Sequence, residues 1–133
     1  MIGTVVPIII YYVRKTFNIK IETRNDITER TTIPIIGEIS HQDEPSNFEV
    51  KDNPRSPLAE QFRILRTNLH FYQQKESAFT IMLTSSMPGE GKTFTSLNLA
   101  STLAANAGSK ILIIGLDLRK PQMAKELGMQ RKK

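Results

Sequence analysis

The chain has 133 residues and a formal net charge of +5; 39% of its residues are hydrophobic and 23% are charged. This is an ordinary globular composition with room for one modest domain, and the lack of cysteine excludes disulfides, thiolate metal sites and cysteine nucleophiles. The positive charge suits anionic partners such as nucleotide phosphates or a membrane surface. The basic residues are scattered, apart from Arg131-Lys132-Lys133, and no aromatic residues are interleaved with them, so we expect no nucleic-acid partner.

Residues 1–13 are almost wholly apolar and end in Tyr11-Tyr12, directly before Arg14-Lys15. As a helix they would reach about 20 Å, less than the ~30 Å of a bilayer core. Three interpretations stay open: the end of a transmembrane helix whose beginning is missing, a secretory signal, or a buried element of a soluble domain. A signal peptide would have a basic start and a small-x-small cleavage site. Aromatic residues followed by basic ones are typical of a helix that enters the cytoplasm, so we favour the truncated transmembrane helix.

Residues 14–54 are assigned to a juxtamembrane segment and a linker. Thr23 and Asp26 have the spacing of a capping box, which predicts a short helix over residues 26–30.

Isoleucines at positions 33, 35 and 39 predict a short strand, which Pro34 limits to a sheet edge or a strand start. Residues 41–54 are polar and carry Asp, Asn, Pro and Ser, which is typical of a linker or surface loop.

A helix is predicted next, because Ser56 suits an N-cap and Pro57 suits the first helical position. Its apolar residues recur at intervals of four and three and form one narrow stripe: Leu58, Phe62, Leu65, Leu69 and Tyr72. Beside the stripe, Glu60, Arg63 and Arg66 lie three residues apart. Spacing alone favours a solvated flank with weak pairing within the helix.

Residues 85–93 are the central motif of the chain, because they join a predicted buried strand over 78–84 to a helical pattern. The apolar side of that helix would carry Leu97, Ala100, Leu103, Ala104 and Ala107. The glycines of the motif allow a tight turn whose N–H groups cradle a polyphosphate at the positive end of the helix. Lys92 adds a charge for the β- and γ-phosphates, and the Thr93 hydroxyl is placed to ligate Mg²⁺. The full motif has glycine where this chain has Ser86, a small residue that can still turn.

A second buried strand is predicted over residues 110–119, after Gly108 as the residue that ends the helix. Strand, helix and strand of this length make a βαβ unit with parallel strands. Asp117 then lies at the carboxyl end of its strand, the edge where ligands bind in open α/β sheets. Arg119 follows two residues later at the same edge. The predicted fold class is therefore α/β, an incomplete P-loop (MinD/ParA-like) parallel sheet with flanking helices over residues 55–133.

Three segments together resemble the cytoplasmic kinase part of the bacterial tyrosine kinases, or BY-kinases, of capsular and exopolysaccharide export. Ser85-Ser86-Met87-Pro88-Gly89-Glu90-Gly91-Lys92-Thr93 resembles their Walker A loop, Ile113-Ile114-Gly115-Leu116-Asp117-Leu118-Arg119-Lys120-Pro121 their Walker A′ segment, and Glu60-x-x-Arg63-x-x-Arg66 their E-x-x-R-x-x-R motif. The order of parts is also similar, with a transmembrane helix, a juxtamembrane stretch like residues 33–39, a linker and then the kinase.

The resemblance implies an enzyme that uses ATP and Mg²⁺ to phosphorylate tyrosines, mostly on a neighbouring subunit, and that regulates polysaccharide assembly. It implies a bacterial inner-membrane protein with a cytoplasmic kinase part, whose partners are neighbouring kinase subunits in a ring and the polysaccharide polymerase and export machinery. The residues carried over for nucleotide binding are Ser86, Met87, Pro88, Gly89, Glu90, Gly91, Lys92, Thr93 and Arg119. Lys92 and Asp117 would be catalytic, Thr93 and Asp117 would bind the metal, and Glu60, Arg63 and Arg66 would form the contact between subunits.

Two departures from the family pattern are visible. The first Asp of the Walker A′ segment is Gly115 here, and the chain stops at Lys133, before a Walker B segment or a tyrosine-rich tail. We therefore expect an internal piece of a longer protein, which alone binds ATP weakly, if at all, and does not turn it over.

Two other kinds of protein would also carry this phosphate-binding loop. A ParA/MinD-like ATPase would have the same loop, but such proteins usually carry an additional lysine near its start, where this chain has Ser86-Met87-Pro88. A non-catalytic chain-length regulator or adaptor would keep the loop only for assembly.

Overall fold

The computed structural model describes residues 6–7, 21, 23–41, 43, 46–73, 78–105, 109–117 and 121–129. The chain divides into two units, residues 1–34 and 35–133. The predicted membrane helix lies outside the described residues except for Val6 and Pro7, which are helical and exposed. In the described ranges, no helix has both the length and the apolar character needed to cross a membrane.

The first unit contains helix α2 (Arg24–Thr28). The Thr23 backbone N–H donates a hydrogen bond to the Asp26 carboxylate at 2.8 Å, as the capping-box spacing predicted. The helix begins two residues before the predicted start at residue 26, because Thr23 itself is the N-cap.

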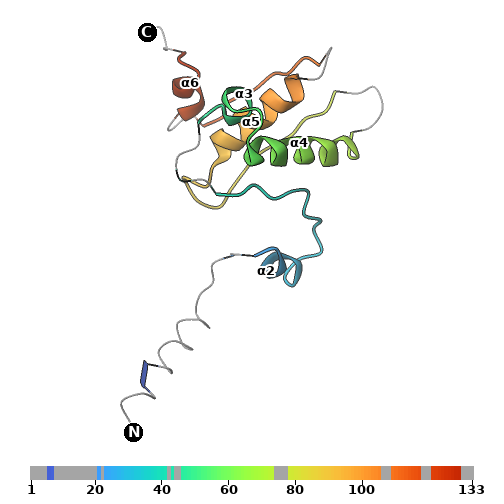
Figure 1. The fold of residues 1–133 in the computed structure, drawn as a ribbon, viewed down its shortest axis with the longest axis vertical. Helices are drawn as coiled ribbons and strands as arrows, with labels where there is room; N and C mark the ends of the chain where they lie inside the picture. Colours follow the sequence, from blue (N-terminus) through green and yellow to red (C-terminus); the bar gives the residue numbers. More distant parts are fainter. Residues whose placement is uncertain are drawn as a thin grey trace. The chain divides into compact units, whose positions relative to one another are not determined.

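The second unit contains α3 (Glu49–Asp52), α4 (Pro57–His70), α5 (Lys92–Ala104) and α6 (Gln122–Glu126) (Figure 1). Helix α4 begins as predicted, with the Ser56 hydroxyl accepting a hydrogen bond from the Ala59 N–H at 3.1 Å.

The core lies where α4 packs against α5, and the predicted stripe of α4 is largely confirmed. Leu58, Phe62 and Leu69 are buried, and the Phe62 ring meets the Phe94 ring of α5 edge-on, with centroids 5.9 Å apart. Tyr72 is more than half exposed, because α4 ends at His70 before reaching it.

The described residues of 35–54, predicted as juxtamembrane segment and linker, pack on α4 and α5 in the second unit. The Asn68 side chain of α4 donates to the Ile36 carbonyl at 2.7 Å, and Gln61 exchanges two hydrogen bonds with Ser40 at 2.8 and 2.7 Å. Ile36 and Ile39 contact the core. No strand is assigned among the described residues of 31–41, since this backbone pairs with side chains of a helix.

A fully buried asparagine of α5 ties this upstream segment to the helix that follows the loop. The side-chain amide oxygen of Asn98 accepts a hydrogen bond from the Val50 N–H of α3 at 3.0 Å. The side-chain NH₂ group donates to the backbone carbonyls of Asn47 at 3.1 Å and Phe94 at 3.0 Å. Thr102, one turn later, is also buried. The helical pattern predicted an alanine-rich buried side, but Ala104 is exposed, and Ala107 lies outside the described residues.

Replacing Asn98 by leucine should lower the free energy of unfolding by about 2–4 kcal/mol, because three backbone groups would lose their hydrogen bonds to this side chain. Urea denaturation measures this difference. The control is Asn25→Leu on exposed α2, which should change stability by less than about 0.5 kcal/mol. Equal stability of the two variants would contradict a structural role for the Asn98 hydrogen bonds.

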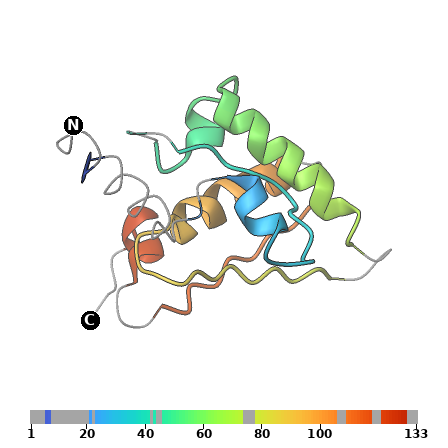
Figure 2. The same cartoon turned by 90° about the horizontal axis from the view of Figure 1, so that it is seen from below.

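Residues 78–84 and 109–117 are extended, and they run in the same direction with α5 as the return between them (Figures 1 and 2). This is the direction of chain that a βαβ unit requires. No strand is assigned in the described part of either segment, so the parallel sheet stays a prediction.

The prediction that both segments are buried is wrong in this structure. Met82, Leu112 and Leu116 are each about four-fifths exposed, and only Ile81 among these segments packs against the core. Within the described ranges, no element covers their outward side chains.

Candidate functional site

The candidate site is the loop of residues 85–91 together with the first turn of α5. Gly89 and Gly91 have φ angles of 87° and 82°, in the left-handed region that glycine enters without steric cost. Gly91 is the N-cap of α5, so the second left-handed residue turns the chain directly into the helix. The tight glycine turn predicted from the motif is therefore present.

Lys92 is the first residue of α5, and its side chain reaches back over the loop. The ammonium group donates to the Ser85 hydroxyl and to the Met87 carbonyl, the latter at 3.2 Å. The Ser85 hydroxyl in turn donates to the Met87 carbonyl at 2.9 Å. The Lys92 ammonium group, which was predicted to contact the phosphates, is therefore hydrogen-bonded to residues of the loop itself.

Glu90 also contacts the loop from within. The Met87 N–H donates to the Glu90 carboxylate at 3.1 Å. This hydrogen bond is the main cause that lowers the pKa of Glu90 below its ordinary value, and the Lys92 charge adds to the effect. The Glu90 carboxylate is therefore ionised at neutral pH.

Thr93 lies in the first turn of α5 beside Lys92 and is partly buried. Ser86, Met87, Pro88 and Gly89 form the exposed part of the loop. The backbone N–H groups of Ser86, Met87 and Gly89 and the Thr93 hydroxyl are the groups that could hold a phosphate and its Mg²⁺.

The second half of the predicted site is described only in part. Asp117 is exposed at the end of the extended segment 109–117, and Arg119 lies outside the described residues. Across the described ranges, no cluster of three acidic or histidine side chains could hold a metal.

Gly115, which stands in the place of an acidic residue of the family pattern, faces α6. A Cβ at this position would lie 3.6 Å from the Met123 sulfur, an ordinary van der Waals distance. Space therefore does not require glycine here.

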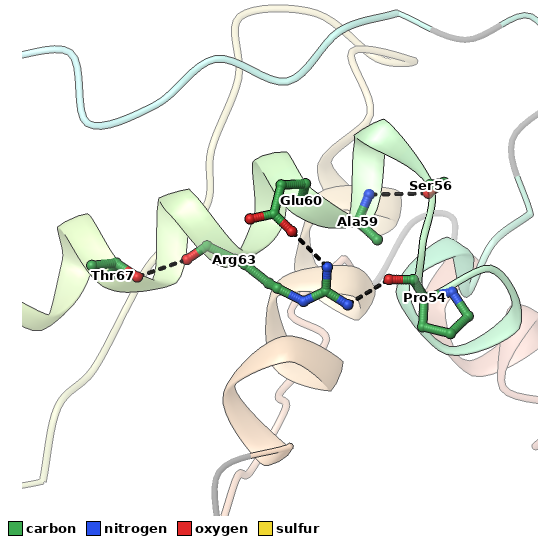
Figure 3. A network of polar contacts seen from close by, with 6 residues as sticks. All are labelled: Pro54, Ser56, Ala59, Glu60, Arg63 and Thr67. Carbon is green, nitrogen blue, oxygen red and sulfur yellow. Dashed lines mark hydrogen bonds and ion pairs between the residues drawn. The ribbon is translucent and has the colours of Figure 1, made fainter.

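The charged flank of α4 is engaged within the chain (Figure 3). Arg63 donates to the Glu60 carboxylate at 2.7 Å and to the Pro54 carbonyl. Arg66 donates to the Thr102 carbonyl near the end of α5 at 3.1 Å. Glu60 and Arg63 pair within the helix and stay exposed to solvent, as the spacing predicted. Arg66 differs, because it is bonded to another helix of its own chain. The contact between subunits stays a prediction.

Ser85 and Asn98 were not among the residues predicted to bind a ligand. Glu90 was predicted to bind nucleotide, but its hydrogen bond with the Met87 N–H was not predicted. A polar residue inside the apolar pattern of α5 was the one signal that could have identified Asn98.

A lysine at the start of a helix, behind a loop with two left-handed glycines, defines a candidate phosphate-binding site. Comparison with known proteins indicates which class of phosphate-binding protein the chain resembles. YwqD, a tyrosine-protein kinase of Bacillus subtilis, is 46% identical over 68 residues, which are 51% of this chain and 28% of YwqD. The Escherichia coli tyrosine-protein kinase Etk is 38% identical over 80 residues, 60% of this chain and 11% of Etk. EpsB of Ralstonia solanacearum is 30% identical over 145 aligned positions, 99% of this chain and 19% of EpsB.

These similarities confirm the resemblance drawn from the three motifs: the chain is related to bacterial tyrosine-protein kinases. It spans less than a third of the length of each of these relatives. No family model matches the chain, and no solved structure matches it.

Proposed function

We propose that the chain is the nucleotide-binding part of an ATP- and Mg²⁺-dependent protein-tyrosine kinase of bacterial polysaccharide export. The observation that carries the proposal is the loop of residues 85–91, whose glycines and Lys92 have the arrangement that a polyphosphate needs. The relation to tyrosine-protein kinases supports this class over a ParA/MinD-like ATPase.

In this proposal the chain's own residues bind and orient the nucleotide. Lys92 leaves Ser85 and Met87 to contact the β- and γ-phosphates, while the N–H groups of the loop hold the phosphate oxygens. Thr93 and Asp117 would supply oxygen ligands for Mg²⁺, and the bound ion would supply positive charge against the phosphates.

We also propose the setting that the resemblance implies. The protein would act at the bacterial inner membrane with its kinase part in the cytoplasm, beside the polymerase and export machinery for capsule or exopolysaccharide. Neighbouring subunits would contact Glu60, Arg63 and Arg66 in a ring. Gly115, where the family pattern has an acidic residue, favours a second candidate, a nucleotide-binding adaptor that transfers no phosphate.

The experiment that tests the proposal is direct measurement of nucleotide binding by the purified chain. We expect ATP to displace a fluorescent ATP analogue weakly and only with Mg²⁺, with no displacement by adenosine, because the contacts are made to phosphates. Binding without phosphoryl transfer to a tyrosine-containing polymer is expected of this chain under both candidates, and phosphoryl transfer by this chain would exclude the adaptor. No binding of ATP, with or without Mg²⁺, would contradict both candidates.

A further inference from the structure

The donor groups of the loop are hydrogen-bonded to other groups of the same loop. The inference drawn from these bonds rests on the proposed function. The Met87 N–H, a donor of the loop, is held by the Glu90 carboxylate at 3.1 Å. Lys92, the cation of the loop, is held by the Ser85 hydroxyl and the Met87 carbonyl. Both kinds of group that bind phosphate therefore have partners before any phosphate arrives.

We propose that Glu90 is a built-in competitor of the nucleotide's phosphates, which holds the Met87 N–H in the empty loop and must leave when a phosphate enters. A carboxylate and a phosphate are both anions, and both accept hydrogen bonds from backbone N–H groups of such concave turns. One donor satisfies one strong acceptor at a time, and two anions at the same turn repel each other. Phosphate binding then includes the displacement of Glu90 and of Lys92 from their present partners.

The position of Glu90 makes this displacement feasible. It lies between Gly89 and Gly91, both in the left-handed region, and its own side chain is exposed. Flexible residues on either side and open solvent beyond allow the carboxylate to swing outward without disturbing the core. Like an ordinary glutamate, Glu90 carries its negative charge throughout the neutral pH range, and the direction of its pKa shift, downward, keeps it so.

The alternative is that the Met87–Glu90 hydrogen bond only braces the turn. The two roles predict opposite signs. If Glu90 braces the loop, its removal loosens the phosphate-binding turn and weakens binding. If Glu90 competes with phosphate, replacing its carboxylate by an uncharged and weaker acceptor makes the Met87 N–H easier to displace, takes away a repelling charge and strengthens binding.

The test compares Glu90→Gln with the unchanged chain by calorimetric titration of ATP with Mg²⁺ and of inorganic pyrophosphate. We expect Glu90→Gln to lower the Kd of both probes by about 2–5-fold, the range for one exposed charge, and the difference to grow at low salt. Because both probes carry phosphates and only one carries adenosine, a common change locates the effect at the phosphates. The difference should stay constant across neutral pH.

Glu29→Gln is the matched control, since it makes the same change in net charge at an exposed residue next to α2, outside the unit that carries the loop. It should leave both Kd values unchanged. An unchanged or higher Kd in Glu90→Gln, while the unchanged chain binds, overturns the competitor role alone. Failure of the unchanged chain and of Glu90→Gln to bind either probe overturns the proposed function and this inference with it.

Discussion

Lys92→Met should weaken Mg²⁺-dependent ATP binding by at least about 10–100-fold, the equivalent of the 1.5–3 kcal/mol typical of a charged hydrogen bond. The fold should survive, because the ammonium group bonds only to Ser85 and Met87 of the loop and to no residue of the core. Binding is measured by displacement of a fluorescent ATP analogue, and stability by the melting temperature without nucleotide.

The matched control is Lys110→Met, which removes the same charge from an exposed position of the segment 109–117. It should leave ATP binding unchanged. ATP binding by Lys92→Met at the original affinity would contradict the role of the loop, and a large drop in its melting temperature would show that Lys92 serves the fold instead. In cells, the same substitution in the gene should remove phosphotyrosine from its product, which an immunoblot measures.

Arg66→Glu should destabilise the chain by about 1.5–3 kcal/mol, since the charged hydrogen bond from Arg66 to the Thr102 carbonyl would be lost. The new carboxylate would also lie near the negative end of the α5 dipole, which is unfavourable. Because α5 carries Lys92 at its start, we expect weaker ATP binding as well. Urea denaturation and ATP titration measure the two effects.

Two further charge reversals separate fold from assembly. Arg63→Glu loses the contacts with Glu60 and Pro54 at the other end of the flank, and should leave ATP binding unchanged. Arg55→Glu, at an exposed residue before α4, is the control for net charge. If the flank also joins subunits, light scattering should show a lower mass for both Arg63→Glu and Arg66→Glu but not for Arg55→Glu. Equal stability of Arg66→Glu and Arg55→Glu would show that the Thr102 contact contributes nothing measurable.

The parts of the fold that the sequence predicted well depend on local chemistry. The start of α4 at Pro57, the capping box at Thr23 and the glycine turn before Lys92 each follow from one or two residues and their neighbours. The same is true of most of the apolar stripe of α4, since a helical period places these residues on one face.

The parts that it did not predict depend on contacts between distant residues. The packing of residues 36–50 on two helices rests on side chains of Gln61, Asn68 and Asn98 that bond to backbone groups more than 20 positions away. No local period encodes such a partner. The apolar runs at 78–84 and 109–117 carry the composition of buried strands, but composition does not say whether another element covers them.

The hydrogen bond between Asn98 and the Val50 N–H has a consequence for amide hydrogen exchange. A helix of four residues such as α3 is too short to protect its own amides, so the Val50 amide is shielded by a side chain of α5. Its exchange rate would therefore report detachment of the upstream segment from the helix that carries Lys92, and not the fraying of α3. A single backbone amide thus provides an internal reporter of whether the two segments are joined, in any state of the loop.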